Sequence, residues 1–299
     1  MEKKAFVFAG QGAQFSGMGR EEFNLSPKAK NVFNKADEIL GFKLSAIMFE
    51  GSDEDLKQTS VTQPALFVHA LAQLSLMDNS TPDGVAGHSL GEFSALVAAH
   101  VLSFEDGLLL VKERAVAMQE ACDSVPGTMA AILGLENHVV EEVCSKIDGI
   151  VVAANYNCPG QLVISGERSA IKKAANDCKD AGAKRALLLP VGGAFHSPLM
   201  DMAKTRLATK IEETSFNEPL CPIYQNVSAI PEKDPEIIKT NLIAQLTGPV
   251  KWTQITERMI KDGFEDFYEF GGNGKVLSGL IKKVNRSVNT LAAKNVFIT

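Results

Sequence analysis

The sequence lacks any apolar run long enough to span a bilayer, and residues 1–4 lead at once into a strand pattern instead of the apolar core of a signal peptide. It also lacks an excess of basic residues, because 30 Lys and Arg against 36 Asp and Glu give a formal net charge of −6. Such a balance disfavours binding to nucleic acid or to an anionic membrane. We therefore expect a soluble cytoplasmic protein that binds neither.

Cysteines with metal-site or disulfide spacing are also missing. The five cysteines are scattered, odd in number and never arranged as Cys-x-x-Cys: Cys122, Cys144, Cys158, Cys178 and Cys221. This pattern argues against a disulfide framework and against a zinc site. The glycine-rich segment Gly10–Gln14 has neither the dinucleotide-binding spacing nor the P-loop spacing. The sequence thus predicts reduced thiols, no metal and no cofactor.

With 299 residues, 45% of them hydrophobic, the chain can bury a full core. Strand and helix patterns alternate up to about residue 123 and again from Pro198, which is typical of an α/β fold. Between them the order is β-α-β-β-α-β, that of a ferredoxin-like unit. We predict an α/β-hydrolase-like large domain with a parallel sheet, residues 1–123 and 192–299, and an inserted ferredoxin-like domain, residues 124–191. A site at their seam would exclude water from both sides.

Local signals predict the element boundaries. Helices are expected near residues 27–40, 64–77 and 103–121, with Thr62 as an N-cap before Pro64 and a capping box that begins at Ser103. In the inserted domain the expected strands lie near residues 128–133, 150–155, 161–165 and 185–191, and the helices near 136–147 and 168–181. The turn between the two middle strands is expected at residues 157–160.

The segment Val85–Phe93 contains Gly-x-Ser-x-Gly between an apolar run and a helical pattern, the signature of a nucleophile elbow. Glycines on either side of Ser89 let strand and helix approach without a Cβ clash. The serine hydroxyl then stands at a helix N-terminus, where free N–H groups can stabilise an oxyanion. The alternative is an ordinary turn between a strand and a helix.

A serine nucleophile needs a base, and His196 is the best placed of the five histidines. It lies just before Pro198 in a loop that leads into a helix, and the positive potential of a helix N-terminus keeps an imidazole neutral. The alternative is a plain loop histidine. The other four are expected to pack inside a helix (His69), to be solvated near helix ends (His100 and His138), or to point away from the serine side chain (His88). No Asp stands in an obvious position to orient the ring.

Arg114 falls on the apolar stripe of its helix, four residues after Leu110 and four before Met118. A buried guanidinium must be paired, because an uncompensated buried charge is costly. Its partner is either an internal carboxylate or the carboxylate of a ligand, which Arg can bind with two parallel hydrogen bonds.

Taken in order, six segments closely resemble the malonyl-CoA:acyl-carrier-protein transacylases of bacterial fatty-acid synthesis, from residue 5 to about residue 284: Gly10–Gln14, Gly87–Glu92, Arg114, Asn155–Gln161, Ala194–Ser197 and Gln245–Leu246. The resemblance implies a monomer that transfers the malonyl group from malonyl-CoA to the phosphopantetheine thiol of acyl carrier protein. The reaction would be ping-pong, through a malonyl-serine intermediate.

The resemblance also implies residue roles. Ser89 would be the nucleophile and His196 the general base and acid, while Arg114 would pair with the free malonyl carboxylate. The remaining roles are the oxyanion hole (backbone N–H of Gln11 and Leu90), orientation of the histidine (carbonyl of Gln245) and support of the site (His88 and Asn157).

Three further features concern substrate and partner. Phe195 and Leu90 resemble malonyl-selective more than methylmalonyl-selective members, although one methyl group changes selectivity by only about 1–3 kcal/mol. The family's usual Gly-Pro-Gly-Lys has Asn273 in place of proline. Because the carrier protein is acidic and this chain is too, docking needs a local basic patch, for which there are two candidates: Lys282, Lys283 and Arg286, or Lys184 and Arg185.

Two other functions compete. A serine esterase or thioesterase shares the elbow, but the inward Arg114 and the absence of an evident Asp between Ser89 and His196 disfavour it. A non-catalytic module that binds acyl-CoA or carrier protein would be free to lose Ser89 or His196, and both are present.

Overall fold

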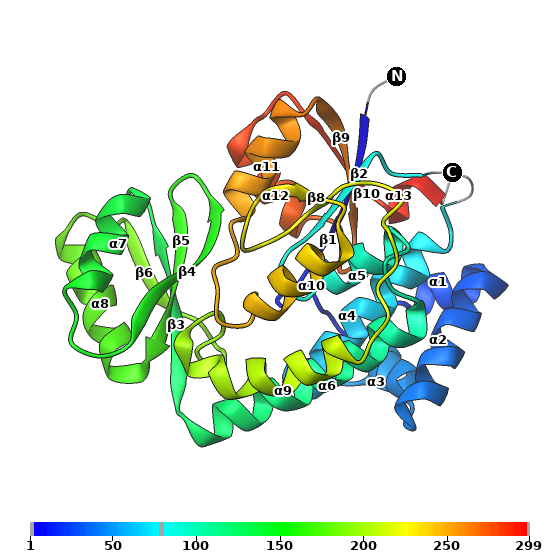
Figure 1. The fold of residues 1–299 in the computed structure, drawn as a ribbon, viewed down its shortest axis with the longest axis horizontal. Helices are drawn as coiled ribbons and strands as arrows, with labels where there is room; N and C mark the ends of the chain where they lie inside the picture. Colours follow the sequence, from blue (N-terminus) through cyan, green and yellow to red (C-terminus); the bar gives the residue numbers. More distant parts are fainter. Residues whose placement is uncertain (1–2, 78–80, 298–299) are drawn as a thin grey trace.

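Two β-sheets, each with a hydrophobic core, make up the protein (Figure 1). The computed structural model describes residues 3–77 and 81–297. Residues 1–2 and 298–299, at the two ends of the predicted large domain, lie outside this description. The predicted combination of a parallel sheet with a second sheet in a mixed α/β fold is confirmed.

The larger sheet has six strands in the order β10-β9-β1-β2-β7-β8. All neighbours are parallel except the antiparallel pair β7 and β8. The strand bounds are β1 Lys3–Phe8, β2 Gly84–Gly87, β7 Ile223–Tyr224, β8 Pro231–Glu232, β9 Phe264–Phe270 and β10 Asn289–Ala292. The central strands read as continuous apolar runs because helices cover both faces of the sheet, α4 and α5 on one side and α11 and α12 on the other (Figure 1).

Helices fill the rest of the large unit, and α6, the longest, packs between α4 and α9. Their bounds are α1 Arg20–Leu25, α2 Pro27–Leu40, α3 Leu44–Glu50, η1 Asp55–Lys57, α4 Thr59–Leu74, α5 Gly91–Ala98, α6 Phe104–Ser124, η2 Pro198–Met200, α9 Asp201–Glu212, α10 Pro235–Ala244, α11 Trp252–Lys261, α12 Val276–Val284 and α13 Lys294–Phe297. The Ser103 cap of α6 is confirmed, since its hydroxyl accepts from the N–H of Asp106.

The predicted start of α4 was wrong. The helix begins at Thr59 after Gln58, and Pro64 lies in its second turn. Thr62 is completely buried, and its hydroxyl donates to the carbonyl oxygens of Leu56 and Gln58 instead of capping a helix. The helix therefore extends one turn before the predicted N-cap, and Thr62 itself is packed in the protein interior.

The smaller sheet has four antiparallel strands in the order β4-β5-β3-β6. The elements follow the predicted β-α-β-β-α-β order: β3 Gly127–Leu133, α7 Asn137–Ser145, β4 Val151–Cys158, β5 Gln161–Glu167, α8 Arg168–Asp180 and β6 Arg185–Leu188. Strand β4 runs three residues further than predicted, and β6 ends at Leu188. The turn between β4 and β5 is only Pro159–Gly160, because Gly160 at φ 72° allows a tight two-residue connection. Asn157, predicted in this turn, therefore lies in a strand.

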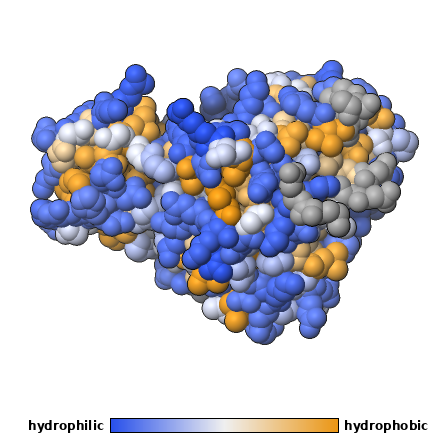
Figure 2. All heavy atoms as spheres, turned by 90° about the horizontal axis from the view of Figure 1, so that it is seen from above, coloured by the Kyte–Doolittle hydropathy of each residue, from blue (hydrophilic) through white to orange (hydrophobic). Residues whose placement is uncertain are grey.

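Strand β4 connects the small sheet to the large unit. The N–H of Tyr156 donates to the carbonyl of Val250 over 2.9 Å, and the N–H of Val250 donates to that of Ala154 over 2.8 Å. Within the described residues no helix is long and apolar enough to cross a membrane. The face drawn in Figure 2 is mainly hydrophilic, with apolar residues in separate patches.

Candidate active site

Ser89 lies on a strained turn between β2, which ends at Gly87, and α5, which begins at Gly91. Its φ of 53° is rare for a residue with a side chain. A Cβ on Gly87 would lie 1.9 Å from the carbonyl carbon of Gly91, and one on Gly91 would lie 2.0 Å from the carbonyl oxygen of Phe8. The two glycines are therefore required for strand and helix to meet, as the elbow pattern predicts.

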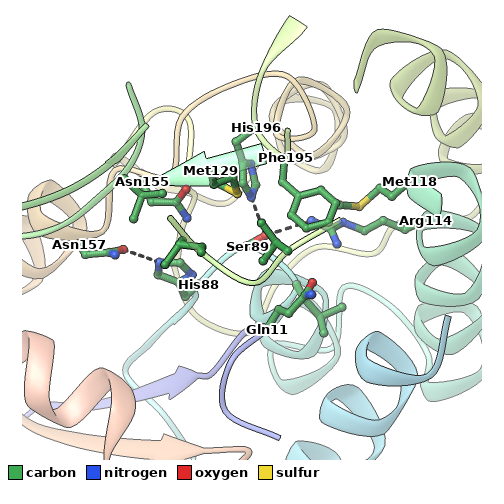
Figure 3. Close-up of a pocket in the computed structure, with 14 residues that line it drawn as sticks. Gln11, His88, Ser89, Arg114, Met118, Met129, Asn155, Asn157, Phe195 and His196 are labelled. Atoms are coloured by element: carbon green, nitrogen blue, oxygen red, sulfur yellow. Dashed lines mark hydrogen bonds between the residues drawn. The ribbon is translucent and has the colours of Figure 1, made fainter. Parts of the chain in front are cut away.

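The hydroxyl of Ser89 lies 2.7 Å from Nε2 of His196 (Figure 3). The other ring nitrogen, Nδ1, lies 2.9 Å from the carbonyl oxygen of Gln245 and 3.2 Å from that of Gly248. Two carbonyl acceptors place the ring proton on Nδ1, so Nε2 is free to accept a proton from the serine. A backbone carbonyl thus occupies the position that an Asp holds in a Ser-His-Asp triad.

The electrostatics keep this histidine neutral. His196 is 4% exposed, and burial, followed by the positive charge of Arg114, lowers its pKa to about 3. Among the other histidines, His69 packs inside α4 with Nε2 3.1 Å from Glu22, whereas His100 and His138 are exposed, all as predicted.

Arg114, on α6, is 1% exposed, which confirms its predicted inward position. Nη1 donates to Oε1 of Gln63 over 2.6 Å, and Nη2 donates to the hydroxyl of Ser89 over 3.0 Å and to Oε1 of Gln245 over 3.3 Å. Its Nε is buried without a hydrogen-bond partner among the described residues. Burial lowers the pKa of Arg114 to about 10, so the side chain stays charged at neutral pH.

An internal carboxylate, that of Glu92, lies near Arg114 but forms no hydrogen bond with it. Glu92 is completely buried and attracts the guanidinium electrostatically, but its carboxylate oxygens accept from the backbone N–H of Asn226 and from Nε2 of Gln225. All hydrogen bonds that Arg114 makes to described residues go to neutral oxygens. A carboxylate that enters the pocket can therefore replace these oxygens as the hydrogen-bond acceptor of the planar guanidinium.

A cavity of about 170 Å³ opens over these residues. The large unit lines it with Gln11, Leu90 and Phe195 around Ser89, while Met129 and Asn155 reach in from the small sheet (Figure 3). The site therefore lies where the small sheet meets the rest of the molecule. The backbone N–H groups of Gln11 and Leu90 donate to no protein group in the described ranges, so both are available to a ligand.

His88 and Asn157 lie beside Ser89 and contact each other. Nε2 of His88 lies 2.9 Å from Oδ1 of Asn157, and its ring packs 5.7 Å from that of Trp252 (Figure 3). The His88 side chain thus turns toward the small sheet and away from the hydroxyl of Ser89, as predicted. Burial lowers its pKa.

The loop with Asn273 in place of proline packs against the segment Gly10–Gln14. Gly272 and Gly274 have φ values of 62° and 70°, and the side chain of Asn273 accepts from the N–H of Lys275 over 3.1 Å. A Cβ on Gly272 would lie 2.6 Å from the carbonyl oxygen of Ala13. The loop therefore packs directly on the segment that carries Gln11.

Three polar residues of the site received no role from the sequence, although Asn155 begins one of the segments that resemble the family: Gln63, Asn155 and Asn226. Oδ1 of Asn226 accepts from the N–H of Ser89 over 2.7 Å, and Nδ2 donates to the carbonyl of Gly87 over 2.6 Å. Asn226 follows β7 at the carboxyl edge of the parallel sheet, where ligand sites gather. A strand of two residues carries no periodic signal, so this position could not be recognised. Among the described residues no group of His, Cys, Asp and Glu is placed to hold a metal ion.

The whole chain is similar to proteins of known family. The family model of the acyl transferase domain matches residues 5–292. The malonyl CoA-acyl carrier protein transacylase of Bacillus subtilis (strain 168) is 44% identical over 300 residues, covering 99% of this chain and 94% of that protein. The chain belongs to the malonyl CoA-acyl carrier protein transacylase family. The family resemblance inferred from the motifs is confirmed.

Solved structures of transacylases superpose over almost the whole chain. The acyl-carrier-protein-S-malonyltransferase from Bartonella henselae has a TM-score of 0.94 at 38% identity and covers 99% of this chain and 100% of its own. A malonyl-transacylase solved in complex with its type II PKS acyl-carrier protein has a TM-score of 0.93 at 38% identity, with 99% and 98% covered.

Proposed function

We propose that this protein is an acyltransferase that moves the malonyl group from malonyl-CoA to the phosphopantetheine thiol of acyl carrier protein in fatty-acid synthesis. One observation carries the proposal: the hydroxyl of Ser89 lies between a neutral His196, at 2.7 Å, and a buried, charged Arg114, at 3.0 Å. Membership of the transacylase family supports the choice of substrates. A base and a carboxylate-binding cation beside one nucleophile fit malonyl transfer.

In the first half-reaction Ser89 attacks the thioester carbon while Nε2 of His196 accepts the hydroxyl proton. The backbone N–H groups of Gln11 and Leu90, two residues that line the cavity, hold the oxyanion in this mechanism. When the carbon–sulfur bond breaks, the histidine returns the proton to the CoA thiolate. The Gln245 carbonyl keeps Nδ1 protonated and stabilises the imidazolium in between.

Arg114 selects the acyl group. A malonyl carboxylate takes over the Nη2 donor that now contacts Ser89, and it frees the hydroxyl to attack. Phe195 and Leu90 close the pocket beside it, which favours malonyl over the bulkier methylmalonyl group. His88 and Asn157 form a hydrogen-bonded pair that shapes the opposite wall.

In the second half-reaction the carrier-protein thiol attacks the malonyl-serine ester, and His196 first accepts the thiol proton and then returns it to Ser89. The test is the fate of preformed malonyl-enzyme in water with or without holo acyl carrier protein, followed as malonyl-carrier protein and free malonate. Transfer should exceed hydrolysis. Equal rates would indicate an esterase or thioesterase, and absence of any malonyl-enzyme would indicate a binding module.

The two basic clusters border a single surface at the β4–β5 turn. Nζ of Lys283 lies 3.4 Å from Oε1 of Gln161, and Lys184 packs on Gly134, whose N–H donates to the carbonyl of Gly160. Strand β4 leads from this turn to Asn157 in the pocket. We therefore place the docking of the acidic carrier protein here.

Docking is tested with Lys283→Glu and Lys184→Glu. Lys282 is left unchanged because its ammonium donates to the carbonyls of Arg286 and Val288 and so holds the chain after α12. Both variants should raise the carrier-protein KM and leave acylation by malonyl-CoA unchanged, while exposed Lys57→Glu changes neither. Equal loss of both half-reactions would contradict this assignment.

The proposal extends to fold and location. The elbow on a parallel sheet supports an α/β-hydrolase-like unit of residues 1–123 and 192–299, and the order β4-β5-β3-β6 supports a ferredoxin-like unit of residues 124–191. All five cysteines are buried free thiols, the form that a reducing cytoplasm maintains. A monomer and a reaction without bound cofactor stay predictions, which gel filtration and activity of the purified chain would test.

A further inference from the structure

Asn226 connects the two sides of the nucleophile elbow. Its Oδ1 accepts from the N–H of Ser89 over 2.7 Å, and its Nδ2 donates to the carbonyl of Gly87 over 2.6 Å. The residue is completely buried, and its side chain is outside the set that lines the cavity. Asn226 therefore contacts the main chain on both sides of His88 without facing the substrate.

Glu92 holds Asn226 in turn. Its Oε2 accepts from the backbone N–H of Asn226 over 2.8 Å, and its Oε1 accepts from Nε2 of Gln225 over 3.2 Å. Glu92 follows Ser89 by one helical turn. Hydrogen bonds therefore connect the segment after β7 to the chain both before Ser89, at Gly87, and after it, at Glu92. These bonds are inside the core, where losing one partner leaves a buried polar group unsatisfied.

We propose that Asn226, held by Glu92, is a positioning residue for acyl transfer that leaves the N–H of Leu90 free for the oxyanion. The inference rests on the proposed function. The next three amides, of Gly91, Glu92 and Phe93, each donate to the carbonyl three residues earlier. By the same spacing Leu90 would donate to Gly87, but Asn226 already donates to that carbonyl.

This arrangement predicts a specific defect for Asn226→Ala. The carbonyl of Gly87 loses its donor, so the N–H of Leu90 turns to it and leaves the oxyanion hole. Loss of one oxyanion donor lowers the rate of the chemical step by about 10²–10³-fold. The contact between Arg114 and the substrate carboxylate is untouched, so binding of malonyl-CoA is retained.

The experiment measures two quantities. The rate of malonyl-Ser89 formation is followed by rapid-quench mass spectrometry, and the dissociation constant of malonyl-CoA is measured by calorimetry in a Ser89→Ala background. Asn226→Ala should slow acylation by about 10²-fold or more and leave the dissociation constant unchanged. Glu92→Gln, which keeps an oxygen for the N–H of Asn226, should acylate faster than Glu92→Ala.

Glu269→Gln is the matched control. Glu269 is also a buried carboxylate that accepts from backbone N–H groups, those of Val276, Leu277 and Ser278, but it caps α12 outside the site. This variant should lower Tm and keep the acylation rate.

Three results would overturn the inference: wild-type acylation by Asn226→Ala, a parallel loss of rate and binding in that variant, or equal rates for Glu92→Gln and Glu92→Ala. The last comparison decides the matter if Asn226→Ala does not fold. Failure of the proposed function is seen separately in the wild-type protein, which would then either form no malonyl-Ser89 or hydrolyse it as fast as it transfers the malonyl group.

Discussion

Nη2 of Arg114 donates a hydrogen bond to the hydroxyl of Ser89 over 3.0 Å. In the proposed mechanism, the group that selects the substrate and the atom that attacks it are thus in direct contact. A short acyl group with a terminal carboxylate can reach both at once, whereas an uncharged acyl group leaves the guanidinium with neutral partners only. The proposed mechanism therefore couples selection of the acyl group to nucleophilic attack.

Replacing Arg114 should reverse acyl preference. Arg114→Ala is expected to lower acylation by malonyl-CoA by about 10- to 100-fold, the value of hydrogen bonds to a charged group, and to spare acylation by acetyl-CoA. Arg114→Lys should fall between the two, because an ammonium cannot match the planar fork. Single-turnover rates with both thioesters measure this. The control is Arg206→Ala, because Arg206 is an exposed arginine that pairs with Glu113 and Glu120. Unchanged selectivity for malonyl-CoA in Arg114→Ala would contradict the assignment.

The pH profile of acylation should reflect the lowered pKa of His196. His196 acts as a base only when neutral, and burial with the charge of Arg114 lowers its pKa from 6.5 to about 3. The rate should therefore stay constant as the pH falls through 6.5. In Arg114→Ala the repelling charge is gone, so the acid limb should move to higher pH. A wild-type midpoint near 6.5 would show that the ring is not buried as described.

Glu92 should make stability depend on pH in the opposite direction to an ordinary paired carboxylate. Burial raises its pKa from 4.5 to about 7, so in this window the folded protein holds a proton that the unfolded chain has released. The free energy of unfolding then falls as the pH rises from 4.5 to 7. Urea denaturation should show that the free energy of unfolding of Glu92→Gln, relative to that of the wild type, increases across this pH window and stays constant above it. A constant difference between the two proteins would refute the raised pKa.

The elbow glycines should not tolerate a methyl group. In Gly87→Ala the new Cβ would lie 1.9 Å from backbone, so strand β2 and helix α5 must separate, with loss of both Tm and acylation. Gly279→Ala, in α12 with nothing within 4 Å of its Cβ, should instead stabilise by about 0.5–1 kcal/mol. Thermal unfolding of the two variants checks the contrast, and a stable, active Gly87→Ala would exclude the strained turn.

The residues that the sequence predicted best are those with a local physical signature. Ser89 has flanking glycines, and Arg114 has a place on the apolar stripe of a helix that proves 1% exposed. The group that orients His196 is a main-chain carbonyl at Gln245, which any residue type could supply. Only the family resemblance indicated it.

The missed features depend on distant parts of the chain. Asn226 reaches Ser89 across 137 positions because β7 pairs with β2, and a strand of two residues leaves no pattern in the sequence. Thr62 looked like a helix cap, but packing buried it inside α4. The overall α/β order follows from local periodicity, whereas such contacts are set by tertiary packing.

The most direct test of the central claim is intact-protein mass spectrometry after brief mixing with malonyl-CoA or acetyl-CoA. We expect a malonyl adduct on the wild type, none on Ser89→Ala, and a loss of malonyl in favour of acetyl on Arg114→Ala. A malonyl adduct that persists in Ser89→Ala, or one that forms equally well without Arg114, would contradict the roles assigned to these two residues.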